Sequence, residues 1–93
     1  MKNLTEISNI IASLKTQTEI CGFLNELLTE SEITALSKRW RILKLLSQGE
    51  TQRKIAKDMN VSLCKITRGA KLLKEKDAIV TQYFTKGKND DKN

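Results

Sequence analysis

The sequence predicts an all-α protein of about six helices. Apolar residues recur at helical spacing along most of the chain, proline is absent, and aromatic residues make up only 4% of the 93 residues. Together these features favour helices over a sheet. A chain of this length forms one domain with a modest core. We therefore predict a single helical domain over residues 1–86, with a helix-turn-helix at residues 51–73 and a disordered polar tail at residues 87–93.

The N-terminal third predicts two short amphipathic helices. Residues 4–14 carry one apolar stripe, with Thr5 as N-cap, and residues 19–28 carry a second stripe. Thr29 and Glu32 then have the spacing of a capping box, in which each side chain accepts a hydrogen bond from the backbone N–H of the other. A new helix therefore begins after Thr29.

The longest predicted helix runs from this capping box to about Gln48, and Gly49 ends it. Trp40 lies on the apolar stripe of this helix. We therefore predict that Trp40 is a core residue at the centre of a dimer and not part of a ligand site. The stripe consists of Ile33, Leu36, Trp40, Leu43 and Leu46 or Ser47, and Ile42 and Leu45 widen its apolar arc.

Residues 51–59 have the features of the first helix of a helix-turn-helix. Thr51 is its predicted N-cap, Ile55 and Met59 face inward, and Ala56 is small enough for a second helix to cross closely. Asn60 tolerates the left-handed backbone conformation that a sharp bend requires. The combination of a cap, a small crossing residue and Asn at the turn favours this motif over two ordinary amphipathic helices with solvated charges.

The second helix of the motif is predicted over residues 63–73. Val61 fills the elbow before it, Ser62 caps it, and Ile66 and Ala70 face inward. Its N-terminal end is the part that helix-turn-helix proteins present to the DNA major groove. The side chains turned outward there are Ser62, Leu63, Lys65 and Thr67.

A last short helix is predicted after the basic link at residues 74–76, with Asp77 as its cap and an apolar stripe that includes Tyr83 and Phe84. The stripes on the first, second and last helices contain more apolar surface than one small domain can bury. Dimerisation through them is the simplest solution, and a monomer whose last helix folds back is the alternative.

Positive charge is concentrated in the second half of the chain. The net charge is +6; residues 1–37 hold two lysines against five glutamates, whereas residues 38–76 hold twelve Lys or Arg against three acidic residues. Such asymmetry is the electrostatic footprint of nucleic-acid binding, because neutralising phosphates releases condensed counterions. An acidic protein or a membrane could attract the same patch, but the helix-turn-helix favours double-stranded DNA.

Other functional classes find little support. Histidine is absent, Cys21 and Cys64 lack metal-ligand spacing, and no glycine-rich phosphate loop occurs. We predict two buried thiols, no metal or required cofactor, no catalytic residues and no enzyme activity. No apolar run approaches the roughly 20 residues that span a bilayer, and the N-terminus lacks the apolar core of a signal peptide, so we expect a cytoplasmic protein without membrane contact.

The sequence resembles the tryptophan operon repressor family from about residue 23 to residue 73. The segments that carry the resemblance are FLNELLTESEITALSKRWRI and TQRKIAKDMNVSLCKITRGAKLLK, of which ITRG is the more distinctive part. The resemblance implies an intertwined all-helical homodimer that represses transcription from a palindromic operator. It also implies that L-tryptophan, as corepressor, binds between the helix-turn-helix and the core.

The resemblance implies an effector site as well. Arg39 would lie on one face of the indole, and Arg68 on the other, where it also pairs with the carboxylate. A guanidinium plane can do both. Leu28 and Thr29 match the pocket wall and the carbonyls that receive the ammonium, and Gly69 allows close approach. The alternative is that both arginines are ordinary phosphate or solvent contacts.

Three departures from the family pattern bear on the effector. Leu72 stands where the tryptophan binders have a serine that helps to hold the ammonium, and Glu26 replaces an apolar residue. Residues 47–50 also form a segment one residue shorter than in the best-known repressors. L-tryptophan, another small effector or no ligand at all therefore remain as alternatives.

The predicted DNA contacts follow from the motif and the resemblance. Arg53 matches a direct guanine contact, for which Arg has the suitable geometry. Lys65 and Lys71 are expected to contact phosphates. The remaining predicted DNA-binding residues are Gln52, Lys54, Ser62, Leu63, Cys64 and Thr67. A basic helical module that binds RNA or an acidic protein is the rival class, but RNA recognition usually needs exposed aromatic residues and the basic half offers only Trp40.

Overall fold

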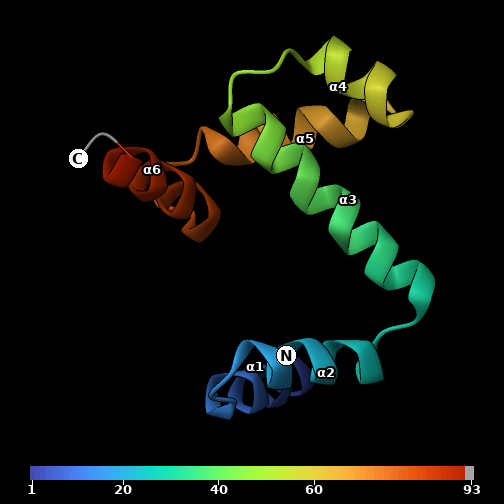
Figure 1. The fold of residues 1–93 in the computed structure, drawn as a ribbon, viewed down its shortest axis with the longest axis vertical. Coiled ribbons are helices and arrows are strands. Elements are labelled where there is room, and N and C mark those ends of the chain that lie inside the picture. The colour runs from blue at the N-terminus through green and yellow to red at the C-terminus, as the bar shows by residue number, and fades with distance from the viewer. Residues whose placement is uncertain (92–93) are drawn as a thin grey trace. The chain divides into compact units, whose positions relative to one another are not determined.

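The computed structural model describes residues 1–91, which are all-α and contain no strand. In chain order the six helices are α1 (Lys2–Ser13), α2 (Gln17–Leu27), α3 (Glu30–Ser47), α4 (Gln52–Met59), α5 (Leu63–Leu73) and α6 (Ile79–Asp91) (Figure 1). The chain divides within α3 into two compact units, Met1–Leu36 and Ser37–Asn93. None of the described helices is long and apolar enough to cross a membrane.

The first two helices begin earlier than the sequence predicts. Thr5 lies inside α1, where its hydroxyl donates to the carbonyl oxygen of Met1 at 3.1 Å, so the prediction that it caps the helix is wrong. Thr16 caps α2 by accepting from the backbone N–H of Glu19 at 3.1 Å. Thr16 and Glu19 have the T-x-x-E spacing of a capping box, a signal that places the start of α2 two residues before the predicted Glu19.

The capping box at the start of α3 is confirmed. Glu32 donates its backbone N–H to Thr29 Oγ1 at 3.2 Å, and the Glu32 carboxylate accepts from the Thr29 N–H at 2.8 Å. The backbone N–H and then the hydroxyl of Thr29 stabilise the carboxylate and lower the pKa of Glu32 below its ordinary value of 4.5. At the other end of α3, Gly49 adopts φ 91°, a left-handed conformation that favours glycine and ends the helix.

Burial along α3 differs from the predicted stripe. Ile42, which was expected only to widen the apolar arc, is 4% exposed, whereas Trp40 remains 42% exposed in the single chain. The difference arises because α4 and α5 cover the Ile42 side of the C-terminal half of α3. The core position predicted for Trp40 would therefore require a second chain.

The core of the Ser37–Asn93 unit joins three helices. Ile42 of α3, Ile55 of α4 and Ile66 of α5 form its buried centre. Figure 1 shows α5 passing behind the C-terminal half of α3, with α4 above it. Partly buried side chains surround the centre, namely Leu45, Leu46, Ala56, Met59 and Val61. The α4–α5 pair is thus attached to α3 by apolar packing.

The last helix packs against α3 through aromatic rings. Phe84 and Tyr83 of α6 lie with ring centroids 5.1 and 5.6 Å from that of Trp40. The helix begins at Ile79, and the residue directly before it is Ala78. Asp77, the predicted cap, lies one residue farther from the start of the helix. Instead of the tail predicted from residue 87, helical backbone continues through Asp91, since extending a formed helix costs little. Residues 92 and 93 lie outside the described residues.

Candidate nucleic-acid interface

The bend between α4 and α5 is built from local backbone bonds. Thr51 caps α4 by accepting from the backbone N–H of Lys54 at 3.2 Å, as predicted. Asn60 adopts the left-handed conformation, φ 53° and ψ 50°, at the C-terminal end of α4. Val61 then donates its backbone N–H to the carbonyl oxygen of Ala56 at 3.2 Å and packs against the core. These bonds hold the direction in which α5 leaves the turn.

The start of α5 is less constrained than the sequence suggests. Ser62 occupies the N-cap position with extended backbone, but its side chain accepts no capping hydrogen bond. Ser62 therefore occupies the predicted N-cap position, but the capping hydrogen bond expected from its side chain is absent. Its hydroxyl is exposed and remains available to another partner.

One side of α5 is buried and the other is exposed. Ile66 is 0% exposed, and Ala70 is partly buried on the same side, as predicted. The exposed side chains include those of Leu63, Cys64, Lys65, Thr67 and Lys71. The sequence therefore predicts correctly that Leu63, Lys65 and Thr67 of α5 face outward.

Both cysteines are exposed, so the prediction of two buried thiols is wrong. Cys64 precedes the fully buried Ile66 by two residues, and residues two apart lie on opposite sides of a helix. Cys21 lies on α2, none of whose residues is fully buried. Burial of the Ile66 side of α5 therefore leaves Cys64 on the opposite, exposed side.

A hydrogen bond brings together two predicted DNA contacts from different helices. Thr67 Oγ1 on α5 lies 3.3 Å from Gln52 Oε1 at the start of α4, and it also donates to the carbonyl oxygen of Leu63 at 2.9 Å. Because a hydroxyl has a single proton, these two acceptors share one donor. The contact joins the start of α4 to the middle of α5.

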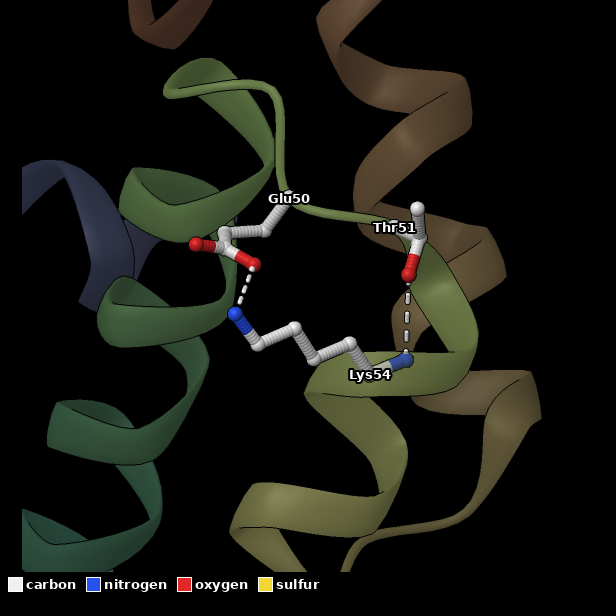
Figure 2. A network of polar contacts seen from close by, with 3 residues as sticks. All are labelled: Glu50, Thr51 and Lys54. Carbon is white, nitrogen blue, oxygen red and sulfur yellow. Dashed lines mark hydrogen bonds and ion pairs between the residues drawn. The ribbon is translucent and has the colours of Figure 1, made fainter.

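The basic surface contains an ion pair that the sequence analysis missed. Lys54 Nζ lies 3.2 Å from Glu50 Oε2, and Figure 2 shows the Lys54 side chain extending back from α4 toward the Glu50 carboxylate. The signal was the i, i+4 spacing of opposite charges. Arg53, next to Lys54, is exposed and forms no ion pair with a side chain of residues 1–86.

A half-open groove of about 430 Å³ lies between the C-terminal half of α3 and α4. The side chains that line it are Lys38, Arg41, Leu45, Glu50, Lys54, Ile55, Asp58 and Met59. Three cations and two carboxylates thus surround an apolar floor. None of the lining residues comes from α5.

The residues assigned to an effector site occupy different parts of the chain. Leu28 is the C-cap of α2, and Thr29 belongs to the capping box before α3. Arg39 on α3 and Arg68 on α5 are both exposed, and neither forms an ion pair within the described residues. Gly69 faces α3, where a Cβ atom would lie 3.3 Å from both Leu43 Cδ2 and Leu46 Cδ1.

In this all-helical chain a left-handed turn joins two helices that carry exposed basic side chains. Such an arrangement is typical of helical DNA-binding regulators. The family model described as Trp repressor protein matches residues 2–87, so the chain belongs to the Trp repressor family. Members of this family are DNA-binding transcriptional regulators, not enzymes.

One relative is the uncharacterized protein YerC of Bacillus subtilis (strain 168), to which the chain is 34% identical over 67 residues. The alignment covers 72% of this chain and 64% of YerC, so the chain spans less than two thirds of that relative's length. No solved structure matches the chain.

Proposed function

We propose that the chain is a sequence-specific DNA-binding transcriptional repressor of the Trp repressor type, with α4, the Asn60 turn and α5 as its helix-turn-helix. The observation that carries the proposal is the contrast within α5. Ile66 is completely buried against the core, whereas Leu63, Cys64 and Lys65 are exposed. A helix fixed on one side and exposed at its N-terminal end has the form that the major groove accepts.

Charge supports the same proposal. Lys65 and Lys71 on α5 and Arg53 on α4 are exposed without an ion pair within the described residues. Exposed cations of this kind neutralise DNA phosphates and provide sequence-independent affinity. Arg53 would add base recognition, because Arg can donate two hydrogen bonds to guanine O6 and N7.

We further propose an intertwined homodimer in which residues 1–86 form one domain. The family match spans both compact units, which supports that extent. In the N-terminal unit, neither α1 nor α2 has a fully buried residue, and Leu4, Ile10 and Leu27 are 45–55% exposed. A partner chain would cover such side chains. A two-fold dimer would place two α5 helices about 34 Å apart and would bind a palindromic site.

The proposed effector is L-tryptophan or another small amphipathic amino acid. The exposed guanidinium groups of Arg39 and Arg68 suit a carboxylate and an aromatic ring, and the carbonyls near Leu28 and Thr29 suit an ammonium group. Leu72, partly buried and apolar, provides no hydroxyl for that ammonium. The residues of the proposed effector site therefore suit the carboxylate and the aromatic ring of an amino acid better than its ammonium group.

A specific observation favours a second candidate, a repressor that needs no ligand. Gly69 was assigned to close approach of an effector, but its missing Cβ faces Leu43 and Leu46 of α3. Close packing of α5 on α3 is enough to explain a glycine there. One residue of the proposed effector site therefore has a structural role without any ligand.

A binding selection on fragments of the source genome, with and without millimolar L-tryptophan, tests both candidates. Enrichment of a palindromic site only with tryptophan would establish a corepressed switch. Equal enrichment in both conditions would favour the ligand-independent repressor. Absence of any enriched duplex, together with retention of single-stranded RNA, would refute DNA repression and support the rival RNA-binding class. Sedimentation of the same sample would measure the expected dimer mass.

A further inference from the structure

Both the backbone N–H and the side-chain ammonium of Lys54 have a partner within the chain. Its backbone N–H donates to Thr51 Oγ1 at 3.2 Å, and its ammonium lies 3.2 Å from the Glu50 carboxylate (Figure 2). The Glu50 side chain is 34% exposed and the Lys54 side chain 59% exposed, so the pair is accessible to solvent and to a competing anion. Among the side chains of residues 1–86 it is the only ion pair.

The position of Glu50 explains why its carboxylate remains beside α4. The first turn of α4 contains Arg53 and Lys54 and no acidic residue. The N-terminus of a helix carries a partial positive charge, which disfavours nearby cations and favours nearby carboxylates. Glu50, just before the cap Thr51, supplies that negative charge. Its carboxylate is therefore attracted by both the helix terminus and the Lys54 ammonium.

The pair also determines which way the Lys54 side chain extends. Glu50 and Lys54 line the groove between α3 and α4, together with Lys38 and Arg41 of α3, and no residue of α5 lines it. The ammonium thus lies on the α3 side of α4. Lys54 was predicted to contact DNA, but a phosphate beside α5 would have to draw its ammonium away from Glu50.

We propose that Glu50 is a positioning residue that withholds the Lys54 ammonium from DNA phosphates and so lowers sequence-independent DNA affinity. This inference rests on the proposed DNA-binding function. A phosphate must replace the carboxylate before Lys54 contributes, and the carboxylate itself repels the DNA backbone. Glu50 thereby reduces the time the protein spends on unrelated sequences.

The salt dependence of binding to a random-sequence duplex tests the proposal. Each phosphate contact adds about one unit to the slope of log affinity against log salt concentration. Glu50→Gln frees Lys54, so its slope should be steeper than that of the wild-type protein by about one unit. A fourfold rise in salt would then weaken the variant about fourfold more. Lys54→Met should leave the wild-type slope nearly unchanged but return the Glu50→Gln slope to the wild-type value.

Glu75→Gln is the matched control, because Glu75 is an exposed acid on the link between α5 and α6 that forms no ion pair within the described residues. It removes the same charge without releasing a lysine, so its slope should equal that of the wild-type protein. The proposal is overturned if Glu50→Gln has the wild-type slope, or if the steeper slope persists after Lys54→Met. Thermal unfolding followed by circular dichroism would confirm that each variant is folded.

A measurement without DNA separates this proposal from the proposed function. Lysines dimethylated with ¹³C give one NMR signal each, and the Lys54 signal should shift in Glu50→Gln but not in Glu75→Gln. An unshifted signal would show that the pair does not form in solution and would overturn the inference alone. A shifted signal with no DNA binding by the wild-type protein would refute DNA repression and, with it, the role assigned to Glu50.

Discussion

Gly69 of α5 lies against Leu43 of α3 so closely that a Cβ atom on the glycine would be 3.3 Å from Leu43 Cδ2. A Cβ would lie equally close to Leu46 Cδ1. The contact allows α5 to approach the core residue Ile42, whose Cγ2 is 3.5 Å from the same position. The glycine in ITRG therefore contributes to the attachment of the proposed recognition helix to α3.

Substitutions at Gly69 should reveal this packing. In Gly69→Ala the higher helix propensity of alanine, up to about 1 kcal/mol, opposes the crowding of two mobile leucine methyl groups. The free energy of unfolding should then change by less than about 1 kcal/mol. Gly69→Val adds more volume and should lower it by about 1–3 kcal/mol. Urea unfolding measures both, and a Gly69→Val variant as stable as wild type would contradict close packing at this position.

Asn60 provides a second stability test, located at the turn. Its φ of 53° is unfavourable for residues with a Cβ, by about 1–2 kcal/mol, although asparagine tolerates it better than most. Asn60→Ala should therefore lower the free energy of unfolding by about 1 kcal/mol, whereas Asn60→Gly should change it little. Guanidinium unfolding of the two variants distinguishes them. Equal stability of the alanine and glycine variants would mean that the turn is not left-handed in solution.

The features that the sequence predicts correctly depend on neighbouring residues. The Thr29–Glu32 capping box, the Thr51 cap and the Asn60 turn each depend on a few consecutive residues, because caps and turns satisfy backbone groups locally. The inward positions of Ile55 and Ile66 follow from helical periodicity. Much of the framework of the proposed interface is therefore evident from local sequence.

The features that were missed depend on the partner of a residue or on the side of a helix that is covered. The sequence gives no measure of whether Trp40 meets Tyr83, and the stripe containing Trp40 did not reveal that α4 and α5 would cover Ile42 instead. Glu50 was counted only as a charge opposing the basic half, although its pairing with Lys54 changes the role of that lysine. The Trp40 contacts are set by the packing of segments distant in the sequence, whereas the Glu50–Lys54 pair had the local signal of i, i+4 spacing.

The capping box makes the start of α3 sensitive to acid. Hydrogen bonds from Thr29 lower the pKa of Glu32 below 4.5, so the folded state favours the carboxylate more than the unfolded chain does. The resulting stabilisation is present above the ordinary pKa and is lost as the pH falls through the lowered one. Thermal unfolding midpoints should therefore fall more steeply on acidification for the wild-type protein than for Glu32→Gln.

NMR titration gives a direct check of this prediction. The Glu32 carboxyl carbon should titrate with a pKa below its ordinary value of 4.5, and Thr29→Val should raise that pKa, since the hydroxyl of Thr29 is lost. The backbone N–H of Thr29, the larger cause, remains in that variant, so the pKa should rise only part of the way. A Glu32 that titrates at its ordinary value of 4.5 would show that the capping box is open in solution.

Arg53 and Lys71 should affect DNA binding in different ways if α4 and α5 form the helix-turn-helix. Arg53 can donate two hydrogen bonds to one guanine, so Arg53→Ala should lower discrimination at one base pair by about 1–3 kcal/mol. Lys71 is expected to contact a phosphate, so Lys71→Ala should weaken all sequences equally and reduce the salt slope by about one unit. Binding to an operator and to its single-base variants at several salt concentrations measures both effects. Uniform weakening by Arg53→Ala would assign Arg53 to the phosphates, and an unchanged salt slope in Lys71→Ala would place Lys71 outside the interface.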